Sequence, residues 1–327
     1  MESFKPAFSL SNRHIQTIYA SLFRAPIPLA FEKKEFALCD GDFLECYWYD
    51  AAQKDKKSPI AILFHGLAGS YESPYIQGVV KELAANGFRS VLMHFRGCTG
   101  RDNRLPRSYH SGDTGDALEF IQSIKKEYAD VKLYGVGYSL GANMLLKLQG
   151  EQKEHSPFEK VVAVSPPMRL DICAKAMNRG ISRYYQYRLL KDLKRALDKK
   201  YNAHDMESLI HLKRQDIEKL NTFEAFDDAY TAPIHGFKSA QDYYEKCSSR
   251  QFLKDIQTPT LIIHAKDDPF MTQAVIPTPE EISSAVTLEL LEKGGHVGFV
   301  AGSLFSPDYW LERRIVSFFK ESHLTLP

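Results

Sequence analysis

Ser139 stands in a pattern that could make it a nucleophile. Residues 137–141 read Gly-Tyr-Ser-Leu-Gly, which fits G-x-S-x-G, with an apolar run at 131–136 before them and a helical pattern at 142–148 after them. In a sharp turn from a strand into a helix, a serine hydroxyl is raised above the end of a sheet, and the flanking glycines avoid collisions with neighbouring elements. An ordinary Gly-rich turn also fits the five positions, so the flanking strand and helix patterns are what favour a nucleophile.

A serine nucleophile needs a base and an acid, and both have candidates late in the chain. His296 lies in the glycine-rich segment GGHVGF, after an expected strand at 287–291. Asp267 and Asp268 follow an expected strand at 260–265, and we favour Asp268 because it directly precedes Pro269 and an apolar residue. Asp267 remains the alternative acid, with a supporting or turn-capping role otherwise. The order Ser, Asp, His along the chain is the one that α/β-hydrolases use.

Two backbone N–H groups are expected to bind an oxyanion. Leu140 follows the serine at a helix N-terminus, where unpaired N–H groups favour negative charge. Leu67 lies in a small-residue loop after the apolar run 59–64, where the second donor arises in this fold. His65 could be mistaken for the base, but its place at a strand end before Gly66 favours a structural side chain. His65, Gly66 and Tyr138 stand beside these donors and are the candidate substrate-binding residues.

These residue types point to acyl transfer. Ser139 would attack an acyl carbonyl while His296 takes its proton, and Asp268 would hold the imidazole in the correct tautomer. The two N–H groups would stabilise the tetrahedral oxyanion, and water would then release the acyl group. The chemistry predicts a serine esterase. An acyltransferase or thioesterase with the same triad is one alternative, and a binding protein of the same fold that has lost turnover is another.

The elements that must position these residues follow a strand–helix alternation. Continuous apolar runs typical of buried parallel strands alternate with amphipathic helices, and an Asp-Gly pair joins two runs at 31–38 and 43–49 into a hairpin. We therefore predict an α/β-hydrolase fold, with a mostly parallel central sheet, helices on both faces and a helical lid insertion. The expected divisions are an N-terminal extension over 1–30, a core over 31–167 and 251–327, and the lid over 168–250.

The lid segment holds no convincing strand. Apolar residues recur every four positions from Ile181 to Leu197 and predict one long amphipathic helix with a basic outer face. Further helical pieces are expected at 206–220 and 240–247. A solvated basic face is favoured over a lipid-binding one, although peripheral lipid contact through the lid stays open. The lid also supplies candidate acyl-pocket aromatics: Tyr184, Tyr185, Tyr230, Phe237 and Tyr243.

The composition of the chain narrows the class of protein further. The 327 residues carry a formal net charge of +1, so no global basic bias favours nucleic acid as a partner. No apolar run approaches the roughly 18 residues that a spanning helix needs, and the first residues lack the apolar core of a signal peptide. Five scattered cysteines without a C-x-x-C pair favour reduced thiols in a cytoplasmic protein. We expect no metal and no cofactor, and the oligomeric state stays undetermined.

The chain resembles the YheT-type branch of the α/β-hydrolases, which is related to abhydrolase-domain lipases. The resemblance spans nearly the whole length and rests on these segments together: NRHIQT, DGDFLECYW, FHGLAGSYESPY, FRGCTG, GYSLGANMLLK, FDDAYTAP, AKDDPF and GGHVGF. It implies a carboxylic-ester hydrolase with Ser139, Asp268 and His296 as its triad. It further implies short- to medium-chain acyl esters, and in some members acylglycerols, as small-molecule substrates. The transmembrane anchor of the animal relatives is not found here, which favours a soluble, bacterial-type protein.

Overall fold

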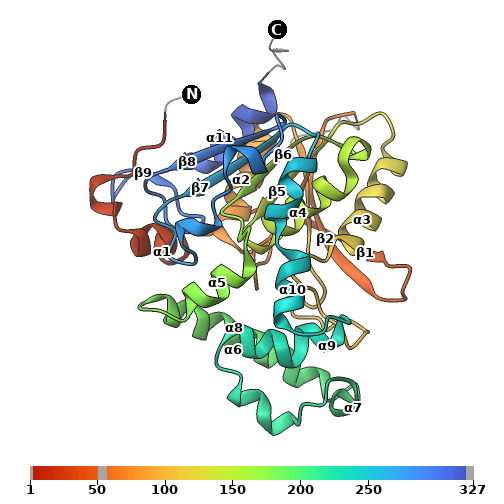
Figure 1. Ribbon diagram of the computed structural model, residues 1–327. Helices are drawn as coiled ribbons and strands as arrows, with labels where there is room; N and C mark the ends of the chain where they lie inside the picture. Colours follow the sequence, from red (N-terminus) through yellow and green to blue (C-terminus); the bar gives the residue numbers. More distant parts are fainter. Residues whose placement is uncertain (1–2, 51–56, 322–327) are drawn as a thin grey trace.

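A central sheet of eight strands organises the protein (Figure 1), whose computed structural model describes residues 3–50 and 57–321. The spatial order is β1-β2-β4-β3-β5-β6-β7-β8. β1, β2 and β4 pair antiparallel, and all remaining neighbours pair parallel, as the continuous apolar runs predicted. The strands are β1 (Glu32–Ala37), β2 (Phe43–Tyr49), β3 (Ile60–Phe64), β4 (Arg89–Met93), β5 (Leu133–Tyr138), β6 (Phe158–Val164), β7 (Thr260–Ala265) and β8 (Val286–Leu291).

Helices cover both faces of the sheet. Alternate residues of β3 point to opposite sides, with Ala61 and Leu63 in one apolar cluster and Ile60 and Ile62 in another. The first cluster includes side chains of α2 (Pro74–Ala85) and α11 (Trp310–Lys320), and the second includes side chains of α3 (Thr114–Glu127) and α4 (Leu140–Gln152). Burial on both faces explains why β3 carries no polar residue. The expected α/β-hydrolase architecture is confirmed.

The insertion between β6 and β7 is helical and gathers at one end of the sheet (Figure 1). Within it, α6 and the pieces that follow bury an apolar cluster of their own around Leu190, Leu197 and Phe226. The expected absence of strands holds for this insertion, all of which the structure describes. Its elements are α5 (Leu170–Met177), α6 (Ser182–Lys200), α7 (Met206–Ile210), a 3₁₀ turn (Arg214–Lys219), α8 (Phe223–Phe226), a π-helix (Asp227–Thr231), α9 (Ala232–Ile234) and α10 (Ala240–Cys247).

Two predictions about helices in the insertion need correction. The single piece expected at 206–220 is two, because α7 ends at Ile210 and His211 adopts a left-handed conformation (φ 55°). Its apolar stripe is interrupted by Lys213 and Arg214, so one straight helix could not bury both ends. The apolar stripe expected along α6 also does not stay on one face. Each step of four residues advances about 400° around a helix, so the stripe turns gradually around the helix axis. Ile181 at its start is therefore 59% exposed, while Leu197 at its end is buried.

The N-terminal segment packs against the carboxyl-terminal part of the core. Asn12 caps α1 (Arg13–Phe23) by accepting hydrogen bonds from the backbone N–H groups of His14 and Ile15. A small hairpin of β9 (Val300–Gly302) and β10 (Pro307–Tyr309) lies next to it and was not expected from the sequence. Further 3₁₀ turns lie at Phe8–Leu10, Lys153–His155, Ser249–Asp255, Gln273–Val275 and Pro279–Glu281.

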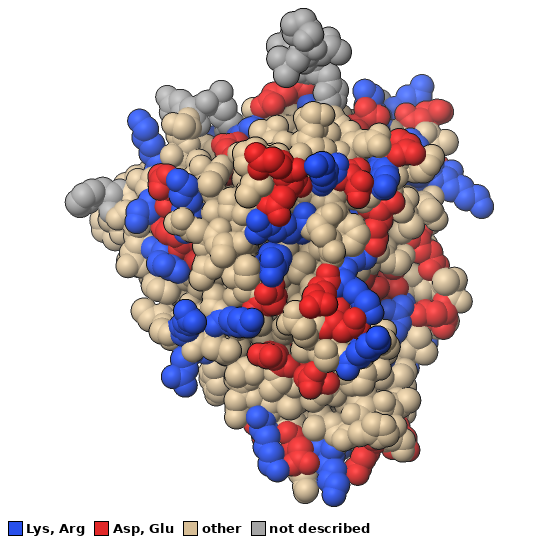
Figure 2. All heavy atoms as spheres, viewed as in Figure 1, with Lys and Arg blue, Asp and Glu red and all other residues tan. Residues whose placement is uncertain are grey.

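The surface shows no strong charge bias on the face in view. Figure 2 shows acidic and basic side chains interspersed there without a continuous region of one sign. Among the described residues, no helix is both long and apolar enough to cross a membrane. The outer side of α6 exposes Tyr184 and Tyr187, beside the basic residues Arg183 and Arg188. Nothing in the structure tests lipid contact there, and that contact stays a prediction.

Candidate active site

The turn between β5 and α4 carries the candidate nucleophile. Ser139 adopts φ 50° and ψ −117°, a left-handed conformation that non-glycine residues rarely hold. A Cβ on Gly137 would lie 2.6 Å from the Ala142 Cα, and a Cβ on Gly141 would lie 2.5 Å from the His65 carbonyl oxygen. Both positions therefore require glycine, because strand, turn and helix approach one another with no room for a side chain.

The three residues expected to form a triad lie in one hydrogen-bonded chain. The Ser139 Oγ is 2.9 Å from the His296 Nε2, and the His296 Nδ1 is 2.7 Å from the Asp268 Oδ2. Asp268 is 2% exposed, and its other oxygen accepts a hydrogen bond from the Phe270 backbone N–H at 2.8 Å. The Phe270 ring stacks on the imidazole with a centroid separation of 4.0 Å. The His296 imidazole is thus held at both ring nitrogens and covered on one face.

Of the two neighbouring carboxylates, only Asp268 contacts the imidazole in the described structure. Asp267 Oδ1 instead accepts a hydrogen bond from the Gly295 backbone N–H at 3.0 Å, next to the histidine. This is the supporting position that the sequence left open for it. The geometry therefore separates the two: one carboxylate meets the ring, and the other holds the loop.

The N-terminal helix supports the same loop, which sequence reasoning missed. Thr17 Oγ1 accepts a hydrogen bond from the His296 backbone N–H at 3.0 Å, and Arg13 Nη2 donates to the Asp268 carbonyl oxygen at 3.1 Å. Gln16, fully buried, donates to the Val300 carbonyl at 2.9 Å and accepts from the Val300 N–H at 2.7 Å. The polar residues in the segment NRHIQT were the feature of the sequence from which this support of the His296 loop could have been predicted. His14 itself stacks on the Tyr185 ring and forms a hydrogen bond with its hydroxyl, which lies 3.2 Å from the His14 Nδ1.

The two candidate oxyanion donors lie beside Ser139 on the pocket wall. In the turn after β3, the N–H of Gly66 donates to the Tyr75 hydroxyl and the N–H of Ala68 donates to the Tyr109 hydroxyl. The Leu67 N–H between them has no hydrogen bond to any described residue. Leu140 is the first residue of α4, where the helix provides no intrahelical partner for its N–H. Both groups can therefore receive a ligand oxygen.

Three residues proposed for substrate binding lie behind the pocket rather than on its wall. His65 is fully buried: its Nδ1 is 2.7 Å from the Gly66 carbonyl oxygen, and its Nε2 accepts from the Phe95 N–H at 3.2 Å. Tyr138 is 1% exposed and packs on Tyr75. Neither they nor Gly66 line the pocket. The geometry gives no support to a substrate contact and agrees with the structural reading of His65.

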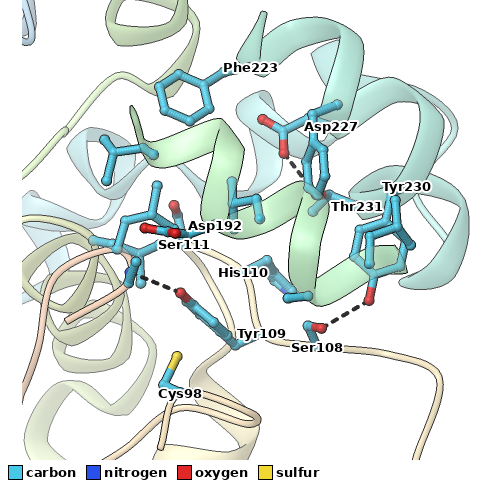
Figure 3. A pocket seen from close by; sticks show the side chains of 18 of the residues that line it. Cys98, Ser108, Tyr109, His110, Ser111, Asp192, Phe223, Asp227, Tyr230 and Thr231 are labelled. Carbon is cyan, nitrogen blue, oxygen red and sulfur yellow. Dashed lines mark hydrogen bonds between the residues drawn. The ribbon is translucent and has the colours of Figure 1, made fainter. Parts of the chain in front are cut away.

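A pocket of about 520 Å³ is lined by Ser139 and His296 and by residues of the helical insertion. Figure 3 shows part of its lining, with Tyr109 and His110 from the core and Phe223 and Tyr230 from the insertion. Of the five lid aromatics proposed for it, Tyr230 and Tyr243 line it. The other three do not, because Tyr184 is 58% exposed, Tyr185 packs on Phe270, and Phe237 packs behind Tyr243. Apolar side chains of α5 and α6 form much of one wall: Leu170, Cys173, Ala174, Met177, Leu189 and Leu193.

The glycine-rich loop after β4 holds an ionic cluster rather than a cradle for phosphate. The Arg96 guanidinium donates to Asp42 at 2.8 Å and to Asp116 at 2.6 Å, and it also meets Asp40. Burial opposes ionisation of Asp42, but hydrogen bonds from Asn103 and nearby backbone N–H groups lower its pKa to about 2. The cluster ties the β1–β2 turn to α3. In the described ranges, no group of three His, Cys, Asp or Glu side chains could hold a metal ion.

Fold and site together place the chain in a family. The family model described as the alpha/beta hydrolase fold matches residues 59–303, and the chain belongs to that family. The Escherichia coli (strain K12) protein named "Putative esterase YheT" is 42% identical over 95% of this chain and 91% of its own. The monoacylglycerol lipase of Saccharomyces cerevisiae is 31% identical over 75% of this chain but only 56% of the yeast protein. The resemblance to the YheT-type branch, among esterase- and lipase-type α/β hydrolases, is confirmed.

Solved structures agree on the fold. The ferulic acid complex of Est1E from Butyrivibrio proteoclasticus has a TM-score of 0.57 at 15% identity, covering 88% of this chain and 97% of its own. The Pyrococcus furiosus esterase Pf2001 has a TM-score of 0.57 at 16% identity, covering 89% of this chain and 91% of its own. At these identities the likeness concerns the arrangement of strands and helices alone.

Proposed function

We propose that this protein is a serine hydrolase that cleaves carboxylic esters through an acyl-enzyme. The observation that carries the proposal is the continuous contact from the Ser139 hydroxyl through His296 to the buried Asp268 carboxylate. A serine hydroxyl is a weak nucleophile at its free pKa, and an adjacent imidazole activates it by taking its proton. Asp268 then orients the ring and stabilises the imidazolium that forms.

The oxyanion of the tetrahedral intermediate would be held by the backbone N–H groups of Leu67 and Leu140. Neither N–H bonds to a residue that the structure describes, and both residues border the same pocket as Ser139. Such donors stabilise charge that develops only as the bond forms, and losing one costs about 10²–10³ in turnover in enzymes where this has been measured. His296 would next activate a water molecule, which releases the acyl group and restores the serine.

The pocket suits short- to medium-chain acyl esters. Its 520 Å³ lie in the range typical of small-molecule sites, and the apolar wall from α5 and α6 would receive an acyl chain. A monoacylglycerol is among the substrates we propose, supported by the name of the yeast relative. Residues 168–250 would act as the lid over this pocket. All five cysteines are free thiols, which supports a reducing, cytoplasmic setting.

Hydrolysis of p-nitrophenyl esters from acetate to palmitate tests the proposal. We expect activity with a chain-length optimum in the wild type, and a loss of at least about 10³-fold in Ser139→Ala at unchanged thermal stability. Ser123→Ala is a matched control, since its hydroxyl donates within α3 to the Phe120 carbonyl and Ser123 does not line the pocket that holds Ser139 and His296. Equal activity in Ser139→Ala and wild type would contradict the proposal.

Two alternatives give different results. An acyltransferase would divert product to an added alcohol, and a thioesterase would prefer acyl thioesters over oxygen esters of the same chain length. A binding protein without turnover would leave Ser139 unlabelled by a fluorophosphonate probe, whereas an activated serine reacts with it.

A further inference from the structure

Two tyrosine hydroxyls hold the backbone on either side of the candidate oxyanion donor Leu67. The N–H of Gly66 donates to the Tyr75 hydroxyl at 3.1 Å, and the N–H of Ala68 donates to the Tyr109 hydroxyl at 3.2 Å. The Leu67 N–H between them forms no hydrogen bond with any residue that the structure describes. The neighbours of the free donor are therefore held by side chains from two other parts of the chain, α2 and the segment before α3.

The peptide that carries the Leu67 N–H is also held at its carbonyl end. The Gly66 carbonyl oxygen accepts a hydrogen bond from the Gly69 N–H at 2.9 Å and lies 2.7 Å from the Nδ1 of the buried His65. In a planar trans peptide the carbonyl and the N–H point in opposite directions, and the described residues contain no cis peptide bond. Because the Gly66 carbonyl is held on the side of His65, the Leu67 N–H points away from His65.

Tyr75 contacts both the turn with the donor and the strand end before the nucleophile. A Cβ on Gly69 would lie 2.7 Å from the Tyr75 hydroxyl oxygen, and a Cβ on Gly66 would lie 3.3 Å from the Ser139 Cβ. The Tyr75 ring packs on Tyr138 with a centroid separation of 4.6 Å, and Tyr138 directly precedes the serine. The hydroxyl thus occupies space that a glycine leaves free, where the two turns come close together.

Tyr109 supports a residue with an uncommon backbone conformation. Ala68 has a φ of 54°, in the left-handed region that residues other than glycine rarely adopt. Such a conformation persists where the surrounding structure holds it. The Tyr109 ring is itself fixed by Phe95, on which it stacks with a centroid separation of 4.9 Å and an interplanar angle of 10°. Its hydroxyl therefore offers the Ala68 N–H an acceptor at a fixed place.

The segment around Tyr109 is also tied to the helical insertion. The Ser108 and Tyr230 hydroxyls form a hydrogen bond at 2.9 Å (Figure 3), and the Ser111 N–H donates to the Tyr243 hydroxyl at 3.0 Å. These two contacts lie on both sides of Tyr109 in the sequence. The position of its hydroxyl is thus set by the insertion as well as by the core.

We propose that Tyr75 and Tyr109 are positioning residues for the oxyanion site. Their hydroxyls hold the N–H groups on either side of Leu67, so that the Leu67 N–H points at the substrate carbonyl oxygen as that oxygen becomes an oxyanion. This inference rests on the proposed ester hydrolysis through Ser139 and goes beyond it, because it assigns roles to two residues outside the triad and the two oxyanion donors.

A purely structural role makes a different prediction. Hydroxyls that only pair buried N–H groups contribute to the stability of the fold, since an unpaired buried N–H is costly. Positioning of the Leu67 N–H acts on the transition state, because that donor meets a charge that develops only as the bond to the serine forms. The two roles are therefore separated by measurements that compare the ground state with the transition state.

Removal of each hydroxyl tests the positioning role. kcat and KM for the best p-nitrophenyl ester are measured in wild type, Tyr75→Phe and Tyr109→Phe. We expect kcat to fall about tenfold in each variant, less than the roughly 10²–10³ that follows loss of a donor, because the Leu67 N–H remains but is held less firmly. KM should stay within about twofold, since the ground-state ester carries no oxyanion.

Tyr71→Phe is the matched control. Tyr71 lies in the same segment between β3 and α2, its hydroxyl is 3.4 Å from the Glu72 Oε1, and it does not line the pocket. We expect its kcat and KM to equal those of the wild type.

A trifluoromethyl ketone with the same acyl chain gives a second readout, which a loss of stability alone would not move. The Ser139 Oγ adds to its carbonyl carbon, the serine proton passes to His296, and the carbonyl oxygen becomes the oxyanion of a tetrahedral adduct. The inhibition constant should rise about tenfold in both variants, in parallel with the fall in kcat/KM. The pH profile of kcat/KM should not shift, because the triad is unchanged.

Several results would overturn the positioning role. A kcat and an inhibition constant within about twofold of wild type in the folded variants would leave the hydroxyls with a structural role only. A rise in KM alone would make Tyr109 a wall contact for the substrate, and an equal loss in Tyr71→Phe would show that the effect is not specific. Where a phenylalanine variant does not fold, 3-fluorotyrosine at that position keeps the shape but weakens the acceptor, and an unchanged kcat there would also contradict the proposal.

Failure of the proposed function gives a different pattern. If wild type and Ser139→Ala cleave the esters equally, or if the wild type cleaves none of them, the ester hydrolysis fails and the positioning role falls with it. If cleavage depends on Ser139 but on neither tyrosine hydroxyl, only the positioning role fails.

Discussion

At the scale of single residues, the site separates side chains that the sequence presents as equals. Asp267 and Asp268 are adjacent, yet one accepts from the Gly295 N–H and the other from the His296 ring. The turn after β7 is closed by a hydrogen bond from the Asp268 N–H to the Ala265 carbonyl at 3.1 Å, with Asp267 inside it and Asp268 at its end. The two neighbours therefore reach different partners. The roles that we propose for the two carboxylates follow from this difference.

Substitution by asparagine distinguishes the two. Asp268→Asn keeps the shape but would present an amide to the imidazole and favour the wrong tautomer, and we expect kcat to fall by about 10⁴, the size of the corresponding effect in a serine protease. Asp267→Asn retains an oxygen for the Gly295 N–H, and we expect less than about a tenfold loss. Steady-state kinetics on the best p-nitrophenyl ester would measure both. A larger loss of kcat in Asp267→Asn than in Asp268→Asn would make Asp267 the acid of the triad and Asp268 the supporting carboxylate.

At the scale of elements, α1 acts as a support for the loop that carries His296. Gln16 holds both backbone groups of Val300, and Thr17 accepts from the His296 N–H. The approach is close: a Cβ on Gly295 would lie 2.5 Å from the Arg13 carbonyl oxygen, and a Cβ on Gly298 would lie 2.4 Å from the Gln16 carbonyl oxygen. The glycines around the histidine therefore serve contact with α1 and not only freedom of the loop.

Thr17→Val tests this support. Valine matches threonine in shape but cannot accept the His296 N–H, so the loop loses a fixed point while the pocket stays intact. We expect kcat to fall between about 10- and 100-fold with little change in KM, because catalytic geometry is sensitive to small displacements of the base. Thr17→Ser, which restores the hydroxyl, should recover most of the rate. A change in KM alone, or no recovery in Thr17→Ser, would argue against positioning.

At the scale of the whole molecule, buried histidines link stability to pH. His65 bridges the turn after β3 and the end of β4 through hydrogen bonds of both ring nitrogens. Burial lowers the pKa of His65 to about 4. Burial, and next the charge that His65 would carry, lower the pKa of His94 to about 3. In the unfolded chain both would titrate near 6.5. The unfolded state then binds more protons below that value, so this contribution to stability is present above about pH 6.5 and is lost as the pH falls toward 4.

His65→Gln should remove part of this acid sensitivity. Between pH 7.5 and 5, the wild type should lose about 2 kcal/mol more unfolding free energy than the variant, since each unit of pKa difference is worth about 1.4 kcal/mol. Urea unfolding at the two pH values measures it. The comparison with the variant is essential, because burial raises the pKa of Asp113 to about 7 and that of Asp227 to about 6, which acts in the opposite direction. Equal losses in both proteins would contradict the assignment to His65.

The sequence by itself determined the features that depend on neighbours along the chain. The buried strands follow from continuous apolar runs, and the turn at Ser139 follows from glycines at fixed spacing, since strand, turn and helix propensities act over a few residues. The order of serine, acid and histidine, with the strand ends that carry them, was likewise readable, and with it the α/β-hydrolase fold. The insertion between β6 and β7 was predictable as helical, but the break after Ile210 and the path of the apolar stripe along α6 were not.

Only the tertiary structure decided which distant groups meet. Thr17 and His296 are 279 positions apart, and no local pattern relates them. The same holds for the choice of Asp268 over Asp267 at the imidazole and for His65 facing the core instead of the pocket. Such contacts form when the insertion and the N-terminal helix close over the sheet, and that closure depends on the packing of whole surfaces.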